Sequence, residues 1–123
     1  MKEVVHKIVN SERGEYVFRS FHGDINTEDI MDSFVHILNN NMISDACLGI
    51  LTDLQDSNMN IDMQTFKNLL IYIKSSPMLT GLKIAVVVDS ADKIVFPMMA
   101  SNEPGLLVQP FSTIKAAENW IVQ

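Results

Sequence analysis

Cysteine and histidine, on which most redox and metal chemistry depends, are scarce in this chain of 123 residues. Cys47 is the only cysteine, so the chain cannot form an internal disulfide, and the apolar run around it (CLGIL) predicts a buried, unreactive thiol. The histidines, at positions 6, 22 and 36, lack the i,i+4 spacing and the nearby cysteines of a metal site. We therefore expect no redox centre, no bound metal and no cofactor.

Positive charge is missing from a long middle segment. No lysine or arginine occurs between Arg19 and Lys67, and the formal net charge of the whole chain is −6. The acidic residues of that interval are Asp24, Glu28, Asp29, Asp32, Asp45, Asp53, Asp56 and Asp62. Such a surface repels phosphate backbones, which bind to clustered basic side chains. We therefore expect no nucleic-acid partner.

Part of this acidity is concentrated at the start of an expected helix. Glu28, Asp29 and Asp32 occupy positions where the helix dipole favours negative charge, and Met31 and Val35 lie beside them in the sequence. One interpretation is a solvated helix start. The other is an acidic interaction face that docks a basic partner protein. The sequence leaves both interpretations open.

Long hydrophobic runs are also absent. Hydrophobic residues make up 47% of the chain, but charges interrupt the apolar alternation of its first residues, MKEVVHKIV, and no segment has signal-peptide or membrane-spanning length. A chain of this size buries about two-thirds of its unfolded surface, which is enough for one hydrophobic core. We expect a single cytoplasmic domain over residues 1–123, with no integral membrane segment.

The known catalytic signatures are missing as well. The sequence has no GxSxG motif, no glycine-rich phosphate loop and no Ser/His/Asp order. Asp53 and Ser90 each follow an expected strand, as in a receiver domain, but the acidic pair and the lysine that such a domain needs are absent. Asp53, Asp56 and Asp62 lack the glycine and the terminal glutamate of a calcium loop. We therefore expect no enzymatic activity.

The apolar pattern of the first half predicts a hairpin followed by a helix. Residues 2–10 and 16–21 alternate as antiparallel strands do. Residues 23–27 are expected to form a turn that ends in a helix N-cap, either Asn26 or Thr27. The inward face of the helix that follows consists of Ile30, Phe34, Ile37 and Leu38.

The second half predicts strands that alternate with helices. The expected strands are residues 47–54, 82–89 and 106–111, and the expected helices begin at Asp62 or Thr65, within residues 91–102, and after an N-cap at Ser112. Residues 56–60 are expected to form a loop. Pro97 has no N–H group, so we expect an irregular turn before it and a short helix that starts at Pro97. The resulting order, ββαβαβαβα, is typical of an α/β fold.

Three C-terminal segments, LKIAVVVD, DKIVFPMMAS and VQPFSTIKAAENWI, together with this order of elements, resemble the SpoIIAA-like, or STAS/SEC14-like, group of domains. The resemblance extends over nearly the whole chain. It implies a mixed β-sheet with helices on its faces and a regulatory, protein-binding role without catalysis. The run DKIVFPMMAS is most similar to less-characterised bacterial members, for which no general biochemical activity is established.

The resemblance also bears on phosphorylation. In the anti-sigma-factor antagonists of this group, a partner kinase phosphorylates a serine at the start of the helix after the third strand, and dephosphorylation restores binding. The corresponding Asp-Ser-[Ser/Ala]-Gly junction falls on residues 62–65 here, where Asp62 matches and Met63 replaces the serine. The phosphoswitch serine is therefore absent, and Thr65 and Ser57 are the remaining candidates for phosphorylation.

Methionine is abundant, and five soft apolar side chains are candidates for a ligand or partner site. They are Met59 and Met63 at the start of the second helix and Phe96, Met98 and Met99 in the third helical stretch. Methionine suits adaptable apolar surfaces, so such a cluster is consistent with a pocket for a lipid-like ligand or a groove for a partner. Ordinary core packing of a methionine-rich protein is the other interpretation.

Two functions follow from these observations. The first is a non-enzymatic regulatory or interaction module that binds another protein or a second copy of itself. The second is a binding or sensing role for a small apolar or lipid-like molecule, with a possible association with membranes. A closed apolar cavity would favour the second function, and an exposed acidic or apolar patch without a cavity would favour the first.

Overall fold

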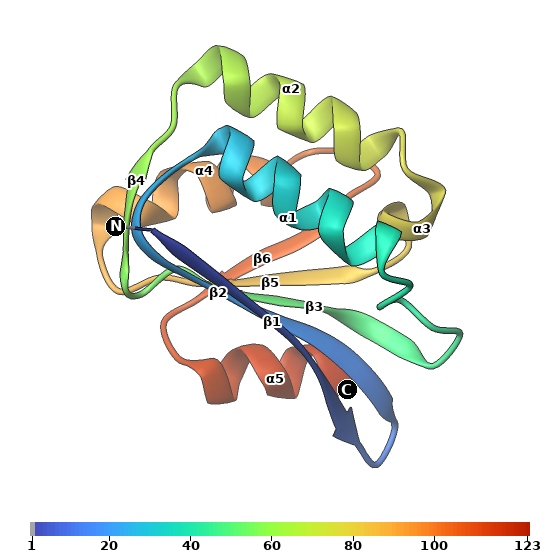
Figure 1. Cartoon of the computed structure of the whole chain (residues 1–123). Helices are drawn as coiled ribbons and strands as arrows, with labels where there is room; N and C mark the ends of the chain where they lie inside the picture. The colour runs from blue at the N-terminus through green and yellow to red at the C-terminus, as the bar shows by residue number, and fades with distance from the viewer. Residues whose placement is uncertain (1) are drawn as a thin grey trace.

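The structure, a computed structural model, describes residues 2–123 and consists of one twisted sheet with helices on both faces (Figure 1). The strands are β1 (Glu3–Ser11), β2 (Gly14–Asn26), β3 (Cys47–Asp53), β4 (Ser57–Asn60), β5 (Lys83–Val87) and β6 (Leu107–Phe111). The spatial order is β1-β2-β3-β5-β6, and β4 pairs with the end of β2. β1 is antiparallel to β2, and the other pairs are parallel. The sheet is therefore mixed.

Helices cover both faces of the sheet, most of them on one face (Figure 1). The helices are α1 (Thr27–Asn39), α2 (Met63–Lys74), α3 (Pro77–Thr80), α4 (Ala91–Ser101) and α5 (Ile114–Val122). Helices α1 to α4 lie on the same side, whereas α5 lies alone on the opposite side. This arrangement confirms the α/β fold class expected from the sequence, a mixed sheet with helices on its faces, with β4 and α3 as additional short elements.

Each face of the sheet has its own hydrophobic core. The larger core, beneath α1 to α4, contains Phe21, Phe34, Ile50, Phe66, Ile84 and Val108. The smaller core, beneath α5, contains Tyr16, Leu51, Ala85, Val87, Ala117 and Ile121. The central strands are apolar on both faces because both faces are covered, as is usual for parallel strands.

Polar side chains begin the first two helices as the sequence predicts. Asn26 accepts a hydrogen bond from the Asp29 amide, and the Asp29 carboxylate accepts one from the Asn26 amide, so the two form a capping box on α1. Asp62 accepts a hydrogen bond from the Thr65 amide and begins α2. In each case the structure selects one of the two predicted cap residues.

The turn predicted at 23–27 and the loop predicted at 56–60 were wrong. β2 continues to Asn26, and residues 57–60 form β4, with Gly23 opposite Ser57 and Asn26 opposite Asn60. Neither segment has strong strand propensity. The pairing occurs because each segment satisfies the backbone groups of the other, which is a long-range effect that local patterns do not reveal.

The prediction that Pro97 starts a short helix was also wrong. Pro97 lies inside α4, which is one helix from Ala91 to Ser101. The proline removes the hydrogen bond to the carbonyl four residues earlier, but its ring is buried, as is Ala100 on the next turn. Packing against the sheet therefore offsets the missing bond. A smaller correction concerns α5, which is capped by Thr113 and not by Ser112.

Gly49 offers a test of the packing around β3. A methyl group at this position would overlap the Lys83 carbonyl oxygen of β5 and lie 3.2 Å from Ile121 of α5. We expect Gly49→Ala to lower the free energy of unfolding by about 2 kcal/mol. The control is Gly81→Ala, where a methyl group meets no atom within 4 Å and the change should stay within about 0.5 kcal/mol. Equal urea midpoints for the two variants would contradict the described packing.

Candidate binding site

A small apolar cavity lies between the sheet and helices α1, α2 and α4. Its volume is about 70 Å³. Its floor includes Thr52 of β3, Ile84 and Val86 of β5, and Val108 of β6. Its roof includes Phe34 of α1, Phe66 and Leu69 of α2, and Pro97 and Ala100 of α4. The cavity therefore lies within the larger of the two cores.

Among the described residues that line this cavity, Arg19 is the one that carries a charge. It lies in the middle of β2, between the buried residues Val17 and Phe21, and is 2% exposed. Its Nε donates a hydrogen bond of 2.8 Å to the Thr52 hydroxyl. The guanidinium carbon lies 3.9 Å from the centre of the Phe34 ring, so the group stacks on that ring. These contacts hold the guanidinium in one orientation.

No carboxylate neutralises Arg19 within the described residues 2–123. Its Nη1 donates to the Ser33 hydroxyl at 3.2 Å and approaches the Ile30 carbonyl oxygen at 3.5 Å, and both acceptors are uncharged. Burial lowers the pKa of Arg19 to about 9. The side chain therefore remains a cation at neutral pH. A buried cation without a carboxylate partner is unusual, because desolvation of a charge costs several kcal/mol.

The remaining amino group, Nη2, has no hydrogen-bond partner in the described chain. Every fully buried polar side-chain atom of residues 2–123 does have a partner. Nη2 must therefore lie where a water-sized space reaches it, and the space that Arg19 borders is the apolar cavity. Arg19 thus brings to this wall a donor group, Nη2, that has no protein partner in the described chain, beside the Thr52 hydroxyl and otherwise apolar side chains.

The mouth of the cavity is formed by half-buried side chains. Met59, Ile61, Leu70 and Phe96 all border the cavity and are partly exposed. The Phe96 ring packs against the Phe66 ring, with 4.8 Å between their centres. The side of the cavity that lies between β4, α2 and α4 therefore reaches the surface, whereas the side at Arg19 is closed.

A chain of hydrogen bonds runs from Arg19 to the surface through Ser33. Because the Ser33 hydroxyl accepts from Arg19, its own hydrogen is free for His6 Nε2, 2.7 Å away. The His6 ring stacks on His36, with 4.3 Å between centres. Burial, with the nearby charges of His36 and Arg19, lowers the pKa of His6 from 6.5 to about 4. His6 is therefore neutral at pH 7, as an acceptor for Ser33 must be.

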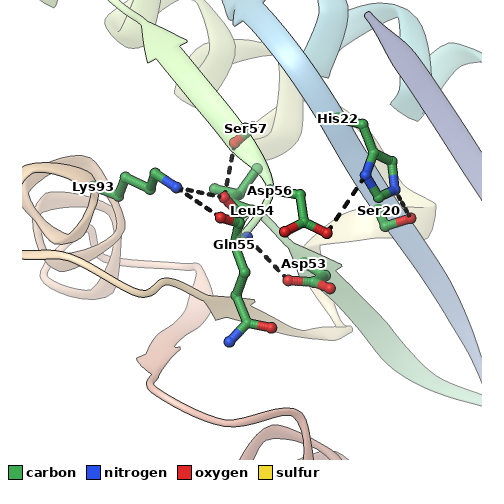
Figure 2. A network of polar contacts seen from close by, with 8 residues as sticks. All are labelled: Ser20, His22, Asp53, Leu54, Gln55, Asp56, Ser57 and Lys93. Carbon is green, nitrogen blue, oxygen red and sulfur yellow. Dashed lines mark hydrogen bonds and ion pairs between the residues drawn. The ribbon is translucent and has the colours of Figure 1, made fainter.

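A second group of polar contacts lies at the carboxyl end of β3 (Figure 2), and one of its residues, Leu54, also lines the cavity. Lys93 of α4 donates hydrogen bonds to the carbonyl oxygens of Leu54 and Gln55, both at 3.0 Å, and to Asp89 at 2.8 Å. The Asp53 carboxylate accepts from the Gln55 amide at 3.0 Å. These contacts tie the start of α4 to the turn between β3 and β4.

The five predicted ligand-site residues separate into two groups. Met59 and Phe96 both line the cavity. Met63, Met98 and Met99 do not border it, and their side chains are exposed on α2 and α4. The structure thus brings two of the five together. Their role in binding stays a prediction.

The predicted acidic face is only partly available. Asp29 belongs to the capping box and accepts a hydrogen bond of 2.9 Å from Lys2, and Met31 packs against the larger core. Glu28, Asp32 and Val35 are exposed. Asp32 also borders an open groove of about 280 Å³ that His6 and His36 share. Docking of a basic partner at these residues stays a prediction.

The two candidate phosphorylation residues are both held in hydrogen bonds. The Ser57 hydroxyl is buried and donates to the Leu54 carbonyl oxygen (Figure 2). The Thr65 hydroxyl is half-buried and lies 2.8 Å from that of Thr27 on α1. A kinase would reach Ser57 only after local opening of the β3–β4 turn, whereas phosphorylation of Thr65 would break the hydroxyl contact with Thr27.

Arg19 is the site residue that the sequence analysis missed. The signal was present: in the run YVFRSF, the strand period of two places Arg19 on the same face as Val17 and Phe21. A charged residue in register with a buried face indicates a functional cation or a paired one. Its chemical surroundings, above all the lack of a carboxylate, depend on the fold.

Comparisons with known proteins support the fold. No model of a known protein family matches the chain, and no curated protein does. Among solved structures, the chain is similar to an uncharacterized protein of the DUF3478 family with a SpoIIAA-like fold from Shewanella loihica PV-4. The two are 15% identical, with a TM-score of 0.67 over 98% of this chain and 95% of the other. The chain therefore has a SpoIIAA-like fold, as the sequence resemblance implied.

Two further observations concern other kinds of site. Within residues 2–123, no group of three or more His, Cys, Asp or Glu side chains is arranged to hold a metal ion. None of the helices in the described chain has the length and apolar character that crossing a bilayer requires.

The depressed pKa of His6 predicts a loss of stability in mild acid. Below pH 6.5 the unfolded chain binds a proton at His6 that the folded chain accepts only near pH 4. The free energy of unfolding should therefore fall between these pH values, by roughly 1 kcal/mol after solvent screening of this half-buried side chain. His6→Gln should reduce this loss. His22→Gln, which changes a histidine on β2 and not on β1, should show most of the same loss. Identical urea midpoints for His6→Gln and the parent at every pH would contradict the assignment.

Proposed function

We propose that this chain is a non-enzymatic binding module that holds a small apolar molecule between its sheet and helices α1, α2 and α4. The observation that carries this proposal is the cavity of about 70 Å³, whose walls are apolar except at Arg19 and Thr52. Small-molecule sites are usually concave and apolar, with a few placed polar groups that fix the orientation of the ligand. The lining of the cavity, with its apolar side chains and two polar groups, meets this description.

The polar groups of the cavity favour binding over catalysis. Arg19 and Thr52 are hydrogen-bonded to each other and do not pair a nucleophile with a base. Arg19 donates and the Thr52 hydroxyl accepts, so neither group is placed to abstract a proton. This arrangement is suited to hold and orient a ligand.

The position of the mouth supports an adaptable site. Met59 is unbranched and flexible, and it borders the cavity beside Phe96. Movement of these two side chains would widen the mouth without a change of the sheet. The small volume of the cavity, about half that of an engineered cavity of ~150 Å³ that holds benzene, favours a slender ligand.

A second candidate function is binding of another protein, or of a second copy of this chain, at the outer surface of α4. Val95, Met98 and Met99 are exposed there, at 50%, 46% and 36%. Apolar side chains grouped on a helix surface mark interaction sites in soluble proteins. Because α4 also forms part of the cavity roof, a bound ligand is in a position to influence this surface.

Filling the cavity tests the first function. We expect Ala100→Leu, on the roof of the cavity, to abolish binding of a small apolar probe such as hexanol while the melting temperature is kept or raised. The matched control is Met98→Ala on the exposed side of α4, which should bind the probe as the parent does. Calorimetric titration measures the affinity. Unchanged hexanol binding by Ala100→Leu, or no binding by the parent protein, would overturn the assignment of the cavity.

Truncation of the exposed methionines tests the second function. Met98→Ala and Met99→Ala should each change the free energy of unfolding by no more than about 0.5 kcal/mol, because both side chains are already exposed. If α4 is a self-association surface, the same variants should lower the fraction of dimer in native mass spectrometry. A parent protein that remains monomeric at millimolar concentration would exclude the second copy as the partner.

A further inference from the structure

We propose that the cavity takes a short, unbranched aliphatic carboxylate, with the carboxylate at Arg19 Nη2 and the hydrocarbon tail under α4. This inference rests on the proposed function and adds the chemical class and the orientation of the ligand. It is carried by three features of the site: an unneutralised buried cation, its free donor group, and an apolar space that begins at that group.

The positive charge of Arg19 favours an anionic ligand group over a neutral polar one. Its contacts in the described chain are a threonine hydroxyl, a serine hydroxyl, a backbone carbonyl and aromatic rings, none of which carries a negative charge. A carboxylate that enters the cavity meets a cation in surroundings of low polarity, where the charge-assisted hydrogen bond is strong. The ligand would thus supply the missing partner of Arg19.

The geometry allows one binding mode for that carboxylate. Nε and Nη1 are occupied by Thr52 and by Ser33, so only the two N–H groups of Nη2 remain for a ligand. Stacking on Phe34 fixes the plane of the guanidinium, and therefore the direction from which an oxygen atom approaches. The donor is held ready before the ligand arrives, which lowers the entropy cost of binding.

The length and width of the cavity floor limit the length and branching of the hydrocarbon tail. From Arg19 on β2 the floor passes over β3 and β5 to Val108 on β6. Neighbouring strands lie about 4.8 Å apart, so this floor is long enough for a chain of about six carbon atoms. The volume of about 70 Å³ is about half that of a cavity that holds the six carbons of benzene, so a six-carbon tail enters only as Met59 and Phe96 at the mouth move outward. A branched tail or a ring would need still more room. Pro97 and Ala100 lie over the distal part of the floor and would contact the end of the tail.

A matched pair of probes tests the inference on the whole chain. Hexanoate and hexanol have tails of the same length and differ in charge. We expect hexanoate to bind the parent protein about 10- to 100-fold more tightly than hexanol, which is the factor that a charge-assisted hydrogen bond supplies. Equal affinities would overturn the inference while leaving the cavity intact. Binding of neither probe would overturn the proposed function as well.

Acetate and inorganic phosphate are the controls for the tail. Both are anions without a long hydrocarbon chain, so we expect them to bind at least 10-fold more weakly than hexanoate. Either one binding as tightly as hexanoate would mean a simple anion site, and would overturn the assignment of the tail to the floor under α4.

Arg19→Met tests the role of the guanidinium. Methionine has a similar length and suits an apolar wall, and replacement of a buried charge in this way is often neutral for stability. The variant should lose the preference for hexanoate and retain hexanol binding. Arg13→Met removes the same charge from the exposed turn between β1 and β2 and should leave both affinities unchanged. An Arg19→Met protein that still prefers hexanoate would overturn the inference.

A spectroscopic measurement on the parent protein needs no variant, and so it decides the question even if Arg19→Met fails to fold. Hexanoate labelled with ¹³C at its carboxyl carbon reports its own protonation in an NMR titration. Pairing with Arg19 lowers the pKa of the bound acid below that of the free acid, whereas a carboxyl group placed elsewhere in an apolar cavity has a raised pKa. A raised pKa would overturn the inference.

Discussion

The structure depends on the pairing of β2 with three other strands. Over its 13 residues this strand pairs with β1 along one edge, and with β3 and then β4 along the other. Both cores are built on it, because Tyr16 faces α5 and Phe21 faces the opposite layer. Since α1 begins where β2 ends, the length of the strand also sets the position of the first helix. A shift of one residue in β2 would exchange the side chains of the two cores.

The same strand places a cation where a hydrophobic residue would be expected. Arg19 lies in register with Val17 and Phe21, so any fold that buries those two residues also buries the guanidinium. Hydrogen bonds to Thr52 of β3 and Ser33 of α1, and stacking on Phe34 of α1, reduce the free-energy cost of burying the guanidinium. The contacts of one charged side chain, Arg19, therefore join β2, β3 and α1 where these three elements meet. Ionisable groups whose pKa is strongly shifted by burial, as that of Arg19 is, cluster at functional sites.

The fold could be predicted from the sequence where the signals are local. The strands β3, β5 and β6 are short apolar runs, and the helix starts at Asn26 and Asp62 carry capping side chains that act within three residues. β4 could not be predicted, because the polar residues 57–60 become a strand only against the end of β2. Pro97 misled for a related reason: a local rule that disfavours proline in a helix was outweighed by burial against the sheet. Of the candidate site, Met59 and Phe96 were anticipated. The unneutralised state of Arg19 was not, because it depends on which side chains three separate elements bring together.

Pro110 affects whether another strand can pair with the β6 edge of the sheet. In β6, Phe111 directs its carbonyl oxygen towards Val88 on the β5 side. Successive residues of a strand alternate, so the backbone amide position of residue 110 faces outward, and in proline that position carries no hydrogen. A further strand that tried to extend the sheet beside β6 would find a donor missing at this point. The opposite edge, β1, keeps its donors, although Glu3 and Lys7 place charges along it. The molecule thus resists edge-to-edge aggregation differently at its two ends, by a missing donor at β6 and by charge at β1.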